Sequence, residues 1–360
     1  MPNTFNAGML QVARQLRGKS QEDLAKDAGV SQAKLSKIEN GLILPDETLA
    51  KNLAGALTLP LSFFAQSERV YGLPLSVHQF FRKRASAGTR VLDQLQAELN
   101  LRIMHIRRIM QAVDVHAEYE LPSLDLEDFD NSPTAVADAI RRAWLIPSGP
   151  IPSLVDVIER AGCIVVPSYF KSGVVDGVSL RVPGLPGLIF INASQPVDRQ
   201  RFSLAHELGH LVMHRHPTPR LEEEADEFAA AFLMPRKDIA GELSGPLTLE
   251  RLAFLKPIWR SSMGSLLYRA KTLGFISENQ SQYLWRQMSM SGYRKVEPVE
   301  ISAEPDRPKL LNAMLQYHLQ TLGYTIEDLS KALHVLPSEL PQLYSVADSV
   351  QPRQHLRIVK

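Results

Sequence analysis

The segment His206–Glu207–Leu208–Gly209–His210 carries the pattern H-E-x-x-H on a stretch whose apolar residues predict a helix. Two histidines four positions apart share one face of a helix, so both imidazoles can bind one zinc ion. Glu207 lies beside them, where its carboxylate can take a proton from a zinc-bound water. Because such groups are costly to bury without a partner, we predict a Zn²⁺ site with ligands His206 and His210 and general base Glu207.

A third protein ligand must come from another segment, and the next predicted helix begins with three glutamates. At about 100° per residue, Glu222 lies nearest to the apolar face of that helix, about 50° away. Glu222 is therefore the predicted third ligand, whereas Glu223 and Glu224 fit a charged first turn. Asp226 is placed to accept a hydrogen bond from a ligand histidine. His214, one turn after His210, remains open as a competing third ligand or as a helix C-terminal histidine that favours the dipole.

A second constellation lies near the N-terminus, where short helices are expected. Ser20 and Ser31 are predicted N-caps, and Gly29 between them suits a left-handed turn. The helix after this turn presents four polar side chains to solvent, namely Ser31, Gln32, Lys34 and Lys37. Gln32 can read an adenine with two hydrogen bonds, while Gln21 and the lysines can contact phosphates.

Composition limits these expectations. With 40 Lys and Arg against 39 Asp and Glu, the net charge of +1 gives no global reason to bind nucleic acid or an acidic membrane. The N-terminal module is also nearly neutral, so a homodimer is expected for useful affinity, and a module that binds only protein stays open. The basic stretch 82–108 fits either phosphate contacts or a solvated helix face.

The length of 360 residues predicts two or three domains of ordinary globular composition. The single cysteine, Cys163, excludes an intramolecular disulfide framework and fits a reducing compartment. No apolar run is long enough for a membrane helix, and the N-terminus lacks the features of a secretory signal. We therefore expect a cytoplasmic protein with no membrane partner.

The expected fold class is α+β and predominantly helical. Apolar, β-rich runs at 163–167, 177–182 and 187–192 predict a small sheet, and helical patterns surround it. Residues 326–335 echo residues 21–30, which fits either a decayed helical repeat or coincidence. The predicted domains are a five-helix module at 1–67, a helical connector at 68–132, an α+β domain at 133–294, and a helical C-terminal region of open role at 295–360.

Two stretches resemble known families. The sequence R-F-S-L-A-H-E-L-G-H at 201–210, the A-D-E-F-A-A-A-F-L-M-P helix at 225–235 and the hairpin residues Asp176–Gly177 and Ile191–Asn192 resemble ImmA/IrrE-type zinc metallopeptidases. This resemblance covers about 134–292. It implies a zincin-like fold, the ligands and base given above, and Glu222 as third ligand. Residues 6–64 resemble an XRE-type, lambda-repressor-like helix-turn-helix, through Ser20–Ala25, Ala28–Ser31 and Leu35–Gly41.

The resulting hypothesis is a transcription regulator that binds double-stranded operator DNA and is also a gluzincin-like zinc endopeptidase. The resemblance implies site-specific cleavage of a repressor or antitoxin-like protein in a stress or mobile-element response. Substrate would add as a strand to an edge of the small sheet, and Tyr169 is the nearest candidate to stabilise the oxyanion. Two alternatives remain: a regulator whose metal domain senses a ligand or partner with little proteolysis, and an antitoxin-like protein that binds its own promoter.

Overall fold

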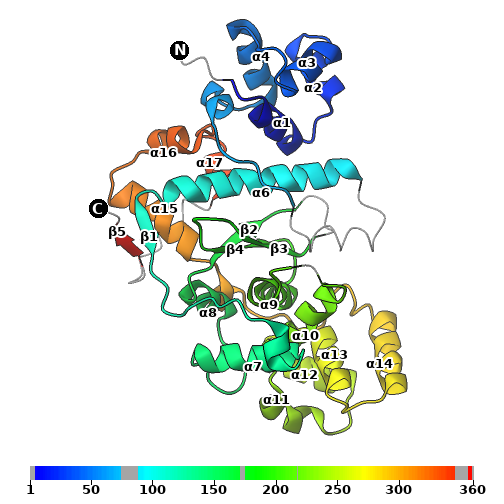
Figure 1. Ribbon diagram of the computed structural model, residues 1–360. Coiled ribbons are helices and arrows are strands. Elements are labelled where there is room, and N and C mark those ends of the chain that lie inside the picture. Colours follow the sequence, from blue (N-terminus) through cyan, green and yellow to red (C-terminus); the bar gives the residue numbers. More distant parts are fainter. Residues whose placement is uncertain (1–4, 74–87, 171–174, 217, 345–355, 359–360) are drawn as a thin grey trace. The chain divides into compact units, whose positions relative to one another are not determined.

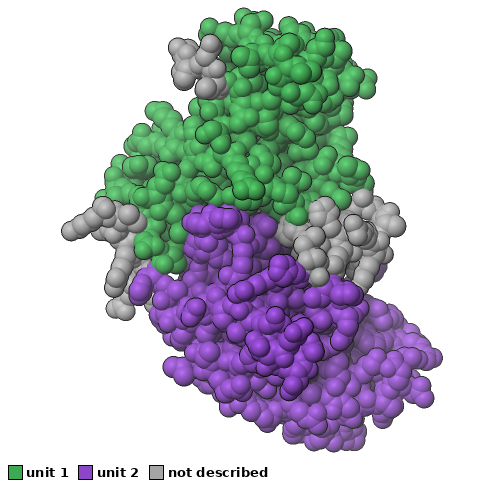
Figure 2. Space-filling view, viewed as in Figure 1, with its two compact units in different colours: residues 1–73, 81–115, 311–360 green, residues 74–80, 116–310 purple. Residues whose placement is uncertain are grey.

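The structure of the protein is a computed structural model that describes residues 5–73, 88–170, 175–216, 218–344 and 356–358 (Figure 1). The chain divides into two compact units (Figure 2). Unit 1 takes residues 1–73, 81–115 and 311–360, and unit 2 takes residues 74–80 and 116–310. Among the described residues, no helix has the length and apolar character needed to cross a bilayer. Residues 82–84, the first part of the basic stretch, lie outside the described ranges.

Unit 1 begins with short helices bounded by the caps that the sequence indicated. The Ser20 hydroxyl accepts a hydrogen bond from the Asp23 amide, and the Asp23 carboxylate accepts one from the Ser20 amide, which forms a capping box. Gly29 ends that helix at φ 71°, a left-handed conformation that glycine adopts without strain. The elements are α1 (Ala7–Leu16), α2 (Gln21–Ala28), α3 (Gln32–Glu39), α4 (Glu47–Leu57) and the 3₁₀ helix η1 (Leu61–Ala65), which stands where a fifth helix was predicted.

The long helix α6 (Thr89–Ile109) joins these N-terminal helices to the C-terminal part of unit 1 (Figure 1). Its residues Ala97, Leu101 and Met104 are buried in the same apolar cluster as the N-terminal helices. The remaining elements are β1 (Val113–Val115), α15 (Leu310–Gln320), α16 (Ile326–Leu333), α17 (Leu340–Leu343) and β5 (Leu356–Ile358), and β5 pairs antiparallel with β1. The chain thus leaves unit 1 after β1 and returns to it at α15.

Unit 2 contains the predicted small sheet in the order β2-β4-β3. β4 pairs parallel with β2 and antiparallel with β3, so that Phe190 lies opposite Val166 on one side and Val178 on the other. β3 is therefore an edge strand, and it runs beside α9. The elements of this part are η2 (Leu126–Phe129), α7 (Pro133–Ala143), α8 (Leu154–Arg160), β2 (Ile164–Ser168), β3 (Gly177–Arg181), β4 (Gly187–Asn192), α9 (Val197–Met213) and α10 (Leu221–Leu233).

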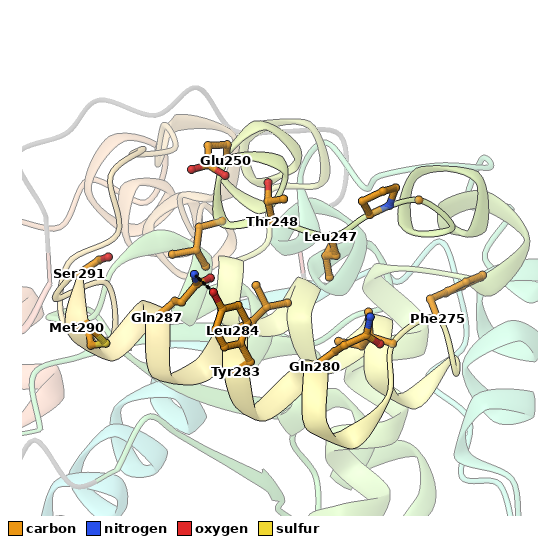
Figure 3. Close-up of a pocket in the computed structure, with 14 residues that line it drawn as sticks. Leu247, Thr248, Glu250, Phe275, Gln280, Tyr283, Leu284, Gln287, Met290 and Ser291 are labelled. Atoms are coloured by element: carbon orange, nitrogen blue, oxygen red, sulfur yellow. Dashed lines mark hydrogen bonds between the residues drawn. The ribbon is translucent and has the colours of Figure 1, made fainter.

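The rest of unit 2 is helical, as the sequence predicted. It comprises α11 (Arg236–Leu243), α12 (Leu249–Trp259), α13 (Met263–Thr272), α14 (Glu278–Met290) and the 3₁₀ helix η3 (Glu304–Asp306). A hollow of about 750 Å³ lies between the start of α12 and α14, where Gln287 donates a hydrogen bond to the Tyr283 hydroxyl (Figure 3). None of the predicted site residues lines this hollow.

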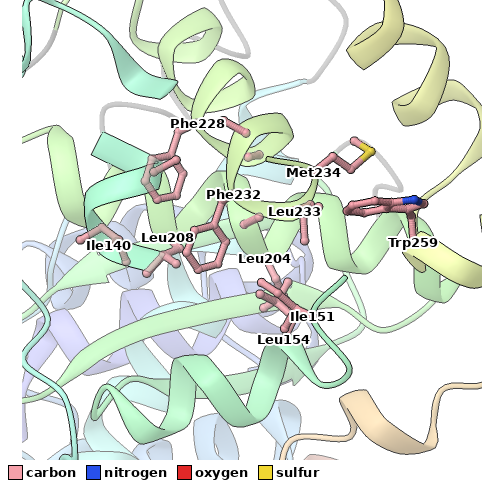
Figure 4. Packing of buried hydrophobic residues seen from close by; sticks show 14 of the residues in the cluster. Ile140, Ile151, Leu154, Leu204, Leu208, Phe228, Phe232, Leu233, Met234 and Trp259 are labelled. Atoms are coloured by element: carbon pink, nitrogen blue, oxygen red, sulfur yellow. The ribbon is translucent and has the colours of Figure 1, made fainter. Parts of the chain in front are cut away.

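The core of unit 2 holds α9 and α10 close together (Figure 4). Leu204 and Leu208 of α9 and Phe228 and Phe232 of α10 are buried in one cluster. Gly209 permits this approach, because a Cβ there would lie 3.0 Å from the Phe228 ring. The close contact brings the histidine face of α9 to the glutamate-rich start of α10.

Candidate metal centre and nucleic-acid interface

The structure brings the three predicted metal ligands together. The Nε2 atoms of His206 and His210 lie 2.9 Å apart, and the Glu222 carboxylate oxygens lie 3.5 Å from His206 Nε2 and 3.7 Å from His210 Nε2. A tetrahedral zinc site with arms of about 2.0–2.1 Å has edges of about 3.3 Å between ligand atoms. The three donors therefore fit around one small divalent cation, with a fourth position left for water or substrate.

The electrostatics of this cluster also suit a cation. Glu222 Oε1 is buried and accepts no hydrogen bond within the described part of the chain, so it is an acceptor that lacks a partner. Burial disfavours a charge on His206, but hydrogen bonds to Asp226 and Glu222 outweigh burial and raise its pKa to about 10. The carboxylates thus stabilise positive charge at this point, and a metal ion would supply it.

Each histidine ligand is fixed by a second hydrogen bond through its other ring nitrogen. His206 Nδ1 lies 2.8 Å from Asp226 Oδ1, which is the contact predicted for Asp226. His210 Nδ1 lies 2.8 Å from His214 Nδ1, and His214 Nε2 lies 3.1 Å from Glu224 Oε2. His214 therefore contacts His210 on the side away from the cluster.

Sequence reasoning missed this role of Glu224. Its carboxylate also accepts a hydrogen bond from Thr218 at 2.8 Å. A glutamate in the first turn of a helix is expected in any case, since it favours the helix dipole, so nothing in the local pattern marked Glu224 as the partner of His214.

Glu207 lies buried against the edge strand β3. The Ser179 hydroxyl donates a hydrogen bond to Glu207 Oε2 at 2.6 Å. An added Cβ at Gly177 would lie 2.9 Å from Glu207 Cγ, so only glycine leaves room for this carboxylate. Burial raises the pKa of Glu207, while the neighbouring His206 opposes that shift. Sequence reasoning named Gly177 only as part of a hairpin and did not find Ser179.

Two buried ion clusters fix the first turns of α9. The Asp306 carboxylate accepts hydrogen bonds from Arg201 at 2.6 Å and from Arg260 at 2.8 Å. Lys256 donates to Asp198 at 2.7 Å and to Glu297 at 2.6 Å. Breaking such a buried pair leaves an uncompensated charge, so these contacts hold α9 in place. No local sequence pattern indicated either cluster.

A hollow of about 1010 Å³ adjoins the centre. Asp226 and Ser203 line it on the side of α9 and α10, and Tyr268 lines it from α13. Burial and the nearby Asp226 raise the pKa of Tyr268, which keeps its hydroxyl protonated. Tyr169, the predicted oxyanion residue, follows β2 and is 67% exposed, and its role stays a prediction.

The predicted nucleic-acid residues lie in unit 1, with Gln21 at the start of α2 and the other four along α3 and at its N-cap. Ser31, Gln32, Lys34 and Lys37 are exposed, whereas Leu35 and Ile38 on the opposite face are buried. Gln32 donates a hydrogen bond to Gln21 Oε1 at 3.3 Å, and Gln21 donates to Glu39 at 2.7 Å. Glu39 in turn accepts from Arg14 at 2.6 Å. The Ser31 side chain accepts from the Lys34 amide, so it caps α3.

Comparison with known families agrees with this geometry. Residues 158–271 match the IrrE N-terminal-like peptidase domain. Residues 10–64 match a helix-turn-helix family. No curated protein sequence matches the chain. The two matches confirm the predicted fusion of a metallopeptidase-type IrrE-like domain with a DNA-binding helix-turn-helix module. The structure confirms the predominantly helical fold with a small sheet.

Proposed function

We propose that this protein is a transcription regulator with a zinc-dependent, site-specific endopeptidase, and that a repressor or antitoxin-like protein is its substrate. The observation that carries the proposal is the convergence of His206, His210 and Glu222 around one point, with Glu207 held beside them. The ligand atoms all lie within 4.8 Å of one another. An H-E-x-x-H helix completed by a glutamate is the donor set of a catalytic zinc site.

The chemistry divides between the bound ion and the chain. Zinc held by these three residues supplies Lewis acidity toward a peptide carbonyl and activates water at neutral pH. Glu207 is placed to accept the proton of the attacking water and to pass it to the leaving amine. The Ser179 hydroxyl fixes the Glu207 carboxylate, and Asp226 and His214 orient the two imidazoles.

We propose that substrate adds as an extended strand to β3. The sheet has two edges, β2 and β3, and only β3 carries a direct hydrogen bond to the general base. Backbone hydrogen bonds would give affinity, and side chains of the substrate would enter neighbouring pockets. The hollow lined by Ser203, Asp226 and Tyr268 lies at the same centre and is the expected place for one of them.

For DNA, we propose that α3 enters the major groove of a double-stranded operator. Gln32 would contact a base, Gln21, Lys34 and Lys37 would contact phosphates, and Ser31 would cap the reading helix. The hydrogen bond between Gln32 and Gln21 orients the amide before binding. A homodimer on two half-sites is expected for this type of domain.

A single comparison tests the enzyme proposal. The wild-type protein and Glu207→Gln are each co-expressed with neighbouring repressor-like gene products, and fragments are identified by mass spectrometry. Fragments that depend on Glu207, together with one zinc per chain, support the proposal. A protein without stoichiometric zinc whose Glu207→Gln form cleaves as well as wild type excludes it. Regulation that survives in Glu207→Gln cells would favour the alternative in which the metal domain is a sensor.

A further inference from the structure

The C-terminal helix α16 repeats the local geometry of α2. Thr325 and Asp328 form a capping box in which the Thr325 hydroxyl donates to Asp328 Oδ2 at 2.7 Å, the same distance as between Ser20 and Asp23. His334 ends α16 at φ 54° and ψ 42°, where Gly29 ends α2 at φ 71° and ψ 34°. A left-handed histidine is uncommon, so its place at the glycine position of the turn is informative.

The hydrogen bonds and the core follow the same repeat. The Val335 amide donates to Ser330 O at 3.0 Å, and the Val30 amide donates to Ala25 O at 2.9 Å. Residues 326–343 align with residues 21–38 at a constant offset of 305 positions, and these two segments are called the two copies below. Each core residue of the first copy has a buried or half-buried counterpart in the second. These pairs are Leu24 with Leu329, Ala25 with Ser330, Ala28 with Leu333, Val30 with Val335, Leu35 with Leu340, and Ile38 with Leu343.

The exposed positions have changed instead. At the same offset, the residues that stand in place of Gln32, Lys34 and Lys37 are Pro337, Glu339 and Gln342. The helix that follows the turn is only the four residues of α17. An acidic side chain in place of Lys34 repels phosphates, so this position is unsuited to contacting DNA.

The second copy contacts the chain's own N-terminal half, and of its three former reading positions Glu339 takes part, whereas Pro337 and Gln342 are exposed. Glu339 forms an ion pair with Arg17 at the end of α1, and Leu343 packs against the apolar cluster of the N-terminal helices. Arg102 of α6 donates to Leu343 O and lies 4.6 Å from the centre of the Tyr344 ring. Arg108 of α6 donates to Ala332 O at 2.8 Å.

We propose that residues 310–344 are a second, degenerate helix-turn-helix that binds α1 through its former reading position Glu339 and binds α6 through its turn and its C-terminal end, and that this copy completes the DNA-binding unit. The N-terminal copy reads DNA and the C-terminal copy fixes it on α6. The DNA-binding unit is therefore built from both ends of the chain, with the IrrE-like domain between them. DNA affinity should then depend on residues more than 270 positions away from α3.

The test uses the full-length protein and two matched truncations of buried leucines. Leu329→Ala changes α16 in unit 1, and Leu284→Ala changes α14 in unit 2. Hydrogen exchange is followed by mass spectrometry, and binding to a fluorescent 30-base-pair duplex of mixed sequence is followed by anisotropy. Leu329→Ala should speed exchange in α1–α4 and α6 by about 30-fold, the factor for a loss of about 2 kcal/mol, and should weaken duplex binding. Leu284→Ala should leave both unchanged.

A milder variant keeps the test decisive if Leu329→Ala does not fold. Glu339→Lys removes the ion pair with Arg17 and should speed exchange at the end of α1 without steepening the salt dependence of duplex binding. Tighter duplex binding with a salt slope larger by about one contact would mean that this face meets DNA, and the proposal would be wrong. Exchange that rises only in α15–α17 in both variants would equally overturn it.

Discussion

The candidate metal centre and the proposed DNA-reading helix α3 are built in opposite ways. His206 and His210 each have both ring nitrogens engaged, and Glu207 is buried with its own hydrogen-bond donor. On α3 the readers project into solvent, and the Gln32 amide donates a hydrogen bond to Gln21. Proton transfer needs fixed atoms in a dry site, whereas base reading needs free donors and acceptors. The effects of substitutions should therefore be strongly coupled at the candidate metal centre and nearly additive on α3.

The largest effect is expected at the general base. Glu207→Gln keeps the shape of the side chain but removes its ability to accept a proton, so cleavage should fall by about 10²–10⁴-fold or more. Metal content measured by mass spectrometry should remain at the wild-type level. Glu223→Gln, on an exposed side chain of the next helix, is the matched control and should cleave normally. Equal activity of the two variants would contradict the assignment of Glu207.

The zinc affinity of variants should distinguish the proposed ligands from the residues that only orient those ligands. Glu222→Ala removes a ligand and should abolish stoichiometric zinc binding at neutral pH. His214→Ala and Asp226→Ala remove only the contacts to the ligand histidines, so each should lower zinc affinity by about 10–100-fold. Competition with a chromophoric chelator measures all three. A His214 variant that loses zinc completely while Glu222→Ala keeps it would restore His214 as the third ligand.

A smaller loss is expected where β3 supports Glu207. Ser179→Ala removes one hydrogen bond to a charged group, so kcat should fall by about tenfold while zinc content stays the same. Gly177→Ala should act in the same direction, because its Cβ would meet Glu207 Cγ. Steady-state kinetics on an identified substrate provides the measurement. If KM rises and kcat is unchanged in both variants, β3 serves substrate binding alone.

Substitutions on the reading helix α3 should have smaller effects, and the effect of each should be independent of the others. Lys34→Ala should lower affinity for all duplexes and reduce the salt slope by about one contact. Gln32→Ala should weaken binding to the operator by about 1–3 kcal/mol and relax the preference for one base pair. Anisotropy titrations of the single and double variants at several salt concentrations test additivity. A strong energetic coupling between Lys34 and Gln32 would contradict the expected difference between this helix and the candidate metal centre.

The smallest effect is expected at the turn of the second copy. Burial and the nearby Arg108 lower the pKa of His334 to about 4, below its ordinary value of 6.5. The unfolded chain then binds a proton on His334 at a higher pH than the folded protein does. The stability that neutral His334 contributes to the fold is therefore complete above about pH 6.5 and is lost as the pH falls toward 4. His334→Gly also relieves the left-handed conformation and should stabilise the protein by about 0.4–1 kcal/mol. Thermal unfolding at pH 7.5 and pH 5 should show a smaller pH dependence in the variant.

Much of the local structure could be predicted from the sequence because its signals are local. Ser20 and Ser31 cap helices where expected, Gly29 takes the left-handed turn, and the three strands lie within a residue or two of their predicted ranges. The phase of α10 also pointed to Glu222, which the structure places beside both histidines. Helical periodicity carries this information, because it fixes which side chains share a face.

What the sequence determined by itself is the set of short-range relations: the caps, the turns, and the two imidazoles one helical turn apart. The tertiary structure alone decided which distant groups meet them. Ser179 reaches Glu207 only because β3 is an edge strand beside α9, and Glu339 reaches Arg17 across 322 positions of sequence. Such contacts depend on how packed elements approach one another, and no periodic pattern in a single chain records that approach.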